Sequence, residues 1–265
     1  MSKLRFSRKY IGIPYVLFLI LFVIAPLVII CYYAFTNGTG AFTFENFAEF
    51  FTSGNTIGTL VYSFAVSLAT TAVCLLIAYP LAYVLAKSSI RSKGLLLLLF
   101  IMPMWINFTL RITALKEILT AIEGNLAFYP FLNSVIGMTY DYLPFMILPI
   151  YNTISKIEKD LTEAASDLGA TSSRVFFKIT LPLSMPGITS GIMMVLLPAM
   201  TNYVVLDMLY NSTYIMGSLI GSYFAAYDWH SGSMISMILL IIICIVTLFT
   251  NRSTDEQSET RGAVL

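Results

Sequence analysis

Long apolar runs, separated by short polar segments, make up most of this sequence. A helix needs about 20 apolar residues to cross a bilayer core of about 30 Å. Six runs reach or nearly reach this length: 11–35, 58–86, 94–115, 134–154, 184–206 and 233–250. Backbone amides have no water to bond to inside hydrocarbon, so these runs are expected to be helices. The pattern predicts an all-α, polytopic membrane bundle of six transmembrane helices.

The composition agrees with lipid as the solvent of the chain. Hydrophobic residues make up 58% of its 265 residues and charged residues only 11%, whereas soluble domains carry about 25% charged residues. A net charge of +1 gives no bulk attraction to nucleic acid. We expect one transmembrane domain over 1–253, followed by a polar cytoplasmic tail over 254–265.

The basic residues predict the orientation, because cytoplasmic loops are enriched in Lys and Arg. Only Arg111 and Lys116 fall on the other side of the predicted bundle. The rest lie in the amino-terminal segment (Lys3, Arg5, Arg8, Lys9), after 58–86 (Lys87, Arg91, Lys93), after 134–154 (Lys156, Lys159, Arg174, Lys178) and in the tail (Arg252, Arg261). This bias predicts a multi-pass protein of the bacterial plasma membrane with both termini in the cytoplasm.

The predicted cytoplasmic segment 157–183 has the pattern of a short helix, a glycine turn and a second short helix. Asp160 can cap the first helix, with Glu163 reaching back to the cap amide. Gly169 fits the left-handed position that ends such a helix. The apolar residues of this helix share one face: Leu161, Ala164, Ala165 and Leu168. The second helix is expected to be capped by Thr171 or Ser172 and to end near Leu181 and Pro182.

The same segment contains a sequence motif. It reads Glu163-Ala164-Ala165, then Gly169, then Ile179-x-Leu181-Pro182. This spacing resembles the EAA signature of permeases from binding-protein-dependent ABC importers, and Pro80-Leu81-Ala82-Tyr83 also resembles that family. The resemblance implies a type I importer permease fold. It also implies that 157–183 contains a coupling helix that docks on an ATPase subunit and moves with it.

The energy for transport is expected to come from another polypeptide. The chain contains no Gly-Lys dipeptide, so the phosphate-binding loop G-x-x-x-x-G-K-[ST] is absent from it. Its single histidine, His230, and the lack of a nucleophile-base motif argue against an enzyme. The resemblance implies no cofactor in this chain, with ATP and Mg bound by two copies of an ATPase subunit. It further implies a second, homologous permease that forms a heterodimer with this one, and an extracytoplasmic binding protein.

Further blocks resemble the PotB type of spermidine/putrescine permease within that family. These blocks are Pro103-Met104-Trp105-Ile106-Asn107, Leu143-Pro144-Phe145-Met146, Pro198-Ala199-Met200 and Asp207. The resemblance implies polyamines as the substrate and a polyamine-binding protein as the external partner.

A path for a polyamine needs carboxylates to replace hydration and aromatic faces for cation–π contact. The candidates for such a path are Trp105, Asp141, Tyr142, Tyr203 and Asp207. Acidic residues within membrane spans usually face a cavity or a partner. Two alternatives remain open: Asp141 or Asp207 can instead neutralise Arg111, and the aromatic residues can belong to the interfacial belt.

Two other functions remain as alternatives. One is an ABC permease for another solute, such as an amino acid derivative, thiamine, an iron complex or sulfate. A path for an anion would need basic residues. The candidate path contains one basic residue, Arg111, and two carboxylates, Asp141 and Asp207, so its charges favour a cation. The other is a secondary transporter, which would need a complete path in one chain, commonly with repeated halves.

Overall fold

The computed structural model describes residues 8–88, 91–209 and 215–262, and the side chains within 12–248. Apart from one antiparallel bridge between Thr36 and Phe42, the regular elements in these ranges are helices. The first half contains α1 (Arg8–Leu19), the π-helix η1 (Ile20–Ile24), α2 (Ala25–Ala34), α3 (Glu45–Thr52), α4 (Gly54–Lys87), α5 (Lys93–Ile101), the 3₁₀ turn η2 (Met102–Trp105) and α6 (Phe108–Glu123). The predicted all-α class is confirmed.

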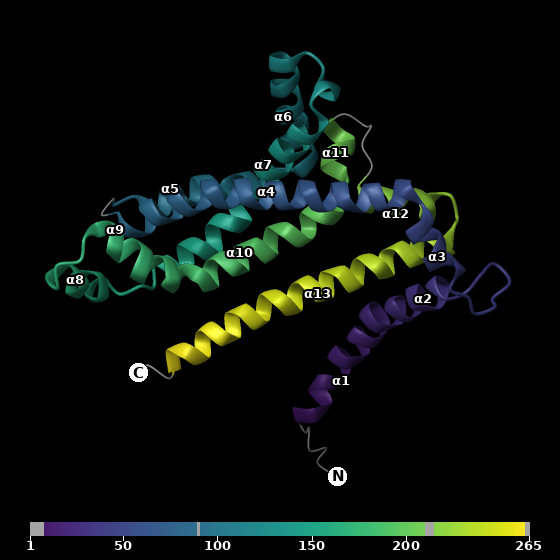
Figure 1. Ribbon diagram of the computed structural model, residues 1–265, viewed down its shortest axis with the longest axis horizontal. Helices are drawn as coiled ribbons and strands as arrows, with labels where there is room; N and C mark the ends of the chain where they lie inside the picture. The colour runs from purple at the N-terminus through teal and green to yellow at the C-terminus, as the bar shows by residue number, and fades with distance from the viewer. Residues whose placement is uncertain (1–7, 89–90, 210–214, 263–265) are drawn as a thin grey trace, which may run out of the picture. The chain divides into compact units, whose positions relative to one another are not determined.

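The second half is also helical (Figure 1). It contains η3 (Leu126–Phe128), α7 (Pro130–Ile154), α8 (Lys159–Asp167), α9 (Ser172–Val175), the π-helix η4 (Phe176–Thr180), α10 (Leu181–Thr201), α11 (Val204–Leu209), α12 (Met216–Ala225) and α13 (Trp229–Gly262). The chain forms two compact units. The first comprises residues up to Ile57 together with Leu219–Ile242, and the second comprises Gly58–Ser218 together with the residues from Ile243 onward.

Four helical segments of the described chain are long and apolar enough to cross a membrane. They are Gly12–Ala34, Gly54–Lys87, Ser172–Thr201 and Trp229–Leu248, and the bent pair α5–α6 would be a fifth. The 25 residues of α7 are also long enough at 1.5 Å per residue, but buried polar residues such as Asn133 and Asp141 lower its apolar content. The predicted count of six spans therefore stays a prediction.

The predicted continuous helix over 94–115 is wrong. The chain bends by 98° between Trp105 and Phe108, and α6 turns away from α5 (Figure 1). Ile106 is extended, and the Asn107 side chain accepts a hydrogen bond from the amide of Leu110 at 3.3 Å, which caps a new helix. An extended residue followed by an Asn cap ends one helix and starts another.

The helix predicted over 184–206 has different ends. Its helical path starts at Ser172 and stops at Thr201, and the separate helix α11 follows. Asn202 has a non-helical ψ of 85° and ends α10. At the other end of the chain, α13 continues as a helix through 254–262, within the predicted polar tail. The basic residues Lys3 and Arg5 and the tail residues 263–265 lie outside the described residues.

Close packing of α7 against α10 forms the centre of the second unit. Gly187 and Gly191, four residues apart on α10, face α7 directly. A Cβ atom on Gly187 would lie 2.7 Å from the carbonyl oxygen of Pro149, and one on Gly191 would lie 2.6 Å from the sulfur of Met146. Small residues at this spacing let two helix backbones approach closely.

Candidate functional site

The segment with the EAA motif begins with the short helix α8, which ends in a glycine turn. Gly169 has a φ of +82°, in the left-handed region that glycine adopts without a Cβ penalty. The Gly169 amide donates to the carbonyl of Ser166 at 2.9 Å, and the Ala170 amide donates to that of Ala165 at 3.0 Å. This is the hydrogen-bond pattern of a Schellman motif, so the predicted left-handed turn is confirmed.

The predicted cap of α8 is wrong. The helix begins at Lys159, its N-cap is Glu158, and no side chain caps it. Asp160 lies two residues after the N-cap position and is already helical, so it cannot be the cap. Its carboxylate in the first turn still has a favourable interaction with the helix dipole.

No residue of α8 is buried by the described part of the chain, and its apolar residues lack cover too. Leu161 is 50% exposed and Leu168 is 89% exposed, while Glu163 and Ala164 are exposed and Ala165 is half-buried. Figure 1 shows α8 at the far end of α9, away from the helices that form the core of the second unit. An exposed apolar side on a rigid short helix is typical of an interaction surface.

The second half of the motif was predicted to form a separate short helix, and this prediction is wrong. α9 passes through the π-helix η4 directly into α10, giving one helical path over Ser172–Thr201. Thr171 is the N-cap residue by position, without a side-chain hydrogen bond. Ile179 lies half-buried in η4, Leu181 is half-buried at the start of α10, and Pro182 is exposed. Pro182 does not end the helix because it directly follows the π-helical turn η4, which accommodates its missing N–H.

A second candidate site is the polar junction, which we define as Trp105, Arg111, Asp141, Tyr142, Asn202, Tyr203 and Asp207. At its centre the guanidinium of Arg111 on α6 pairs with the carboxylate of Asp141 on α7, and both side chains are buried. Arg111 also donates to the carbonyl of Pro103 at 2.9 Å. Of the two alternatives for Asp141, the structure has the one in which it neutralises Arg111.

Aromatic rings complete the surroundings of Arg111. Its Cζ lies 5.9 Å from the ring centre of Phe108 and 5.7 Å from that of Tyr140, within the range of cation–π attraction. The guanidinium therefore connects α6, α7 and the carbonyl of Pro103 on η2. It holds the bend between α5 and α6 against α7.

The remaining predicted residues lie on α7 (Tyr142), at the start of α11 (Tyr203 and Asp207) and at the bend between α5 and α6 (Trp105). Tyr142 is buried, and its hydroxyl accepts a hydrogen bond from the Asn202 side chain at 2.8 Å. The next residue, Tyr203, and Asp207 on α11 are exposed, and Trp105 at the bend is 75% exposed. Sequence reasoning missed Asn202; its signal is an amide side chain inside an otherwise apolar run.

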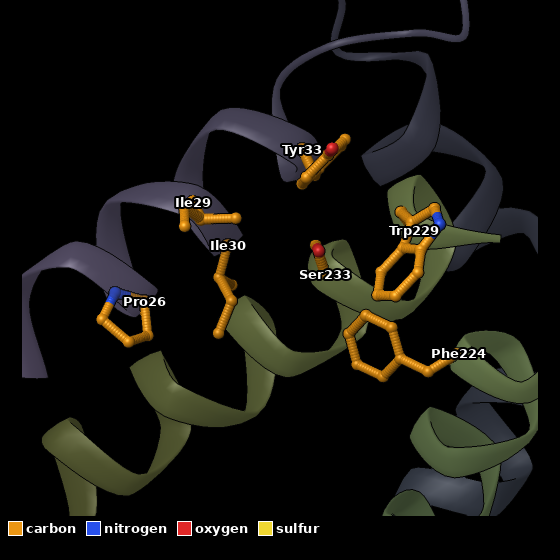
Figure 2. Close-up of a pocket in the computed structure, with 7 residues that line it drawn as sticks. All are labelled: Pro26, Ile29, Ile30, Tyr33, Phe224, Trp229 and Ser233. Carbon is orange, nitrogen blue, oxygen red and sulfur yellow. The ribbon is translucent and has the colours of Figure 1, made fainter. Parts of the chain in front are cut away.

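A cavity of about 410 Å³ lies in the first unit. Figure 2 shows its lining: Pro26, Ile29, Ile30, Tyr33, Phe224, Trp229 and Ser233. The lining carries no charged side chain. A polycation needs carboxylates to replace its hydration, so this cavity does not have the chemistry of a polyamine site.

Residues 78–253 match the family described as "Binding-protein-dependent transport system inner membrane component". The solved structure of a bacterial alginate ABC transporter in complex with a periplasmic protein contains a chain with a similar fold. Its TM-score is 0.73 at 14% identity, and the match covers 92% of each chain. Another solved bacterial alginate importer gives a TM-score of 0.70 at 16% identity, covering 94% of each chain.

Curated relatives extend the similarity over most of the chain. The spermidine/putrescine transport system permease protein PotB of Haemophilus influenzae is 35% identical over 253 residues, which covers 86% of this chain and 87% of that protein. PotB of Escherichia coli is 36% identical over 205 residues, covering 71% of this chain and 74% of that protein.

Proposed function

Since this chain belongs to the family of binding-protein-dependent transport system inner membrane components, we propose that it is the permease subunit of an ATP-driven importer for polyamines. The PotB relatives carry this substrate assignment, because two of them share about a third of their residues with the chain over most of its length. Spermidine and putrescine are flexible chains of ammonium groups. The importer would sit in the bacterial plasma membrane, with both termini of this chain in the cytoplasm.

The observation that supports a coupled importer most directly is the uncovered apolar side of α8. Leu161 and Leu168 are exposed beside a glycine turn that fixes the direction in which the chain leaves the helix. A partner surface that buries these side chains would gain hydrophobic free energy of about 25 cal/mol per Å². We assign the apolar side of α8, with Ala164 and Ala165, to docking on an ATPase subunit, together with the exposed Glu163 on another face of the same helix.

The other partners follow from the family. Two ATPase copies would bind ATP and Mg, a second homologous permease would complete the path as a heterodimer, and an external binding protein would deliver the polyamine. Closure of the ATPase pair would move 157–183 and switch the path between outward and inward access. This chain itself would perform no hydrolysis.

Within the polar junction we assign cation contact to Asp207, to Tyr203 one helical turn before it, and to Trp105 at the bend between α5 and α6. All three side chains are exposed, so a substrate passing along the surface shared with a second permease can reach them. Asp141 already pairs with Arg111, and its charge is not available to a polyamine. Tyr142 is held by Asn202 and supports the junction.

Uptake of labelled spermidine tests the function. Cells that lack this chain and other polyamine importers are compared with and without the chain on a plasmid. Uptake that returns only with the plasmid supports the proposal, and unchanged uptake would contradict the polyamine assignment.

A matched variant tests the docking surface in the same cells. Leu168→Glu places a charge on the exposed apolar side of α8 without disturbing a packed core, and Phe128→Glu alters an exposed side chain in η3, far from 157–183 along the chain. We expect Leu168→Glu to abolish uptake and Phe128→Glu to preserve it, with both proteins present in the membrane at equal amounts. Equal uptake by the two variants would contradict docking through α8.

A further inference from the structure

An aromatic cluster joins the EAA segment to α4. The ring of Phe176, the first residue of η4, lies 5.9 Å from the ring of Tyr79 and 5.3 Å from that of Tyr83, centre to centre. Both pairs are edge-to-face, with interplanar angles of 85°, which is a preferred arrangement of aromatic rings. Tyr79 and Tyr83 are four residues apart, and so lie one above the other on one face of α4.

Tyr79 makes a second link, to the helix α10 that follows this segment. Its hydroxyl lies 3.1 Å from the hydroxyl of Ser184, which is buried on α10 and donates to the carbonyl of Leu181 at 2.8 Å. Phe176 and Ser184 lie on either side of the end of η4. α4 therefore contacts the helix both where the π-helical stretch begins and after it has ended.

The stretch between these two contacts departs from a regular α-helix. The Leu181 amide donates to the carbonyl of Phe176, five residues back, so the turn contains one extra residue. Pro182 follows and has no N–H to donate. A π-helical turn beside a proline is a place where a helix changes register or direction. This turn is therefore a place where movement of α8 and α9 can be absorbed before it reaches α10.

We propose that Tyr79, Tyr83 and Phe176 form an aromatic clasp that transmits displacement of α8 and α9 to α4. The three are positioning residues, which act through the contact between η4 and α4. The clasp gives a physical role to Tyr83 of the Pro80-Leu81-Ala82-Tyr83 block, whose Ala82 is fully buried. The inference rests on the proposed function, because it assumes that an ATPase moves α8.

The test uses the complete importer, reconstituted in liposomes with its partner permease, ATPase and binding protein. ATP hydrolysis and uptake of labelled spermidine are measured together, and their ratio gives the coupling. Phe176→Leu and Tyr83→Leu keep apolar volume but remove a ring. We expect each to raise the ATP hydrolysed per spermidine about fivefold or more, a typical loss of coupling between sites. Tyr83→Phe keeps the ring and should leave the ratio unchanged.

The number of ATP molecules hydrolysed per spermidine distinguishes a role of the aromatic clasp in coupling from a role in folding alone. If the Leu variants lower hydrolysis and uptake in parallel, or change neither, the ratio stays constant and the clasp is overturned. An equal rise for Tyr83→Phe would also overturn it, since the phenol ring is intact in that variant.

A second readout needs no polyamine. Spin labels are placed on α4 at Leu76 and on α10 at Met194, both exposed, in a variant whose three cysteines are replaced. We expect ATP to shift the distance between the labels in the otherwise unchanged protein, and Phe176→Leu to lose most of that shift. A full shift in Phe176→Leu overturns the clasp. Failure of the unmodified importer to take up spermidine would instead remove the polyamine assignment and leave the clasp to be judged by the label distances.

Discussion

The guanidinium of Arg111 on α6 forms a buried ion pair with the carboxylate of Asp141 on α7. Burying two charges is costly, and the cost is offset only when the pair has good geometry and further hydrogen bonds. Arg111 gains part of this compensation from the carbonyl of Pro103 and the rings of Phe108 and Tyr140, while its buried Nε has no hydrogen-bond partner among the described residues. The pair thus stabilises the 98° bend between α5 and α6.

Removing one partner of this pair should destabilise the protein. In Asp141→Asn the Arg111 charge stays buried without compensation, which we expect to lower the free energy of unfolding by about 3–5 kcal/mol. The measurement is the thermal midpoint of the purified importer in detergent, followed by tryptophan fluorescence.

The control for this prediction replaces both partners. Arg111→Met combined with Asp141→Leu leaves no buried charge and should recover most of the loss, except about 1 kcal/mol for the hydrogen bond to Pro103. If the double variant melts no higher than Asp141→Asn, the ion pair does not determine the stability of the junction.

Asp207 should matter for transport and not for stability. It is exposed on α11, and within the described residues it has no ionic partner. We expect Asp207→Asn to lower spermidine uptake about tenfold at low substrate concentration, because loss of one charge contact with a cation costs on the order of 1.4 kcal/mol. Initial uptake rates measured over a range of spermidine concentrations check this.

Glu117 on α6 provides the matched comparison. It is an exposed carboxylate on the same predicted side of the membrane but outside the polar junction. Glu117→Gln removes the same charge and should leave uptake intact. If the two variants lose spermidine uptake equally, the polyamine is attracted by the overall negative charge of the surface. A specific contact at Asp207 would then be contradicted.

The sequence predicts best where local chemistry decides the structure. The Gly169 turn depends on a residue that adopts positive φ and on carbonyls within the preceding helix, so the sequence is enough to place it. The bend at Trp105 could not be predicted in this way. The run 94–115 is mainly apolar on both sides of the Asn107 cap, so its hydropathy gives no sign that the helix is interrupted there. What stabilises the bend is Arg111, through a partner 30 residues away on α7.

The polar junction shows the same limit for the site. The sequence left open whether Asp141 or Asp207 neutralises Arg111, since both were expected at similar depth. Only the fold, which brings Arg111 of α6 beside Asp141 of α7, selects Asp141. The path of the chain after Leu181 also escaped prediction, because Pro182 reads as a helix end and the preceding π-helical turn accommodates it instead.

Gly169 should be required for its backbone conformation alone. A Cβ atom there would meet nothing within 4 Å, so a substitution causes no clash. Valine at a φ of +82° costs about 1–2 kcal/mol, enough to distort the turn after α8. We expect Gly169→Val to lose most spermidine uptake, and Gly169→Asn to keep it because Asn tolerates the left-handed region. Similar uptake by the two variants would remove the turn from the account of coupling.

Gly187, unlike Gly169, should be required because there is no space for a side chain between α10 and α7 at this position. A Cβ atom there would lie 2.6 Å from the Thr153 hydroxyl and 2.7 Å from the Pro149 carbonyl, so α10 and α7 would have to separate. Overpacking of this kind costs about 1–3 kcal/mol, and we expect Gly187→Ala to lower the thermal midpoint. Gly58→Ala, on α4 with nothing within 4 Å, should raise stability by about 0.5–1 kcal/mol because alanine favours the helix. Equal midpoints for the two variants would show that α7 and α10 can separate without cost at this contact.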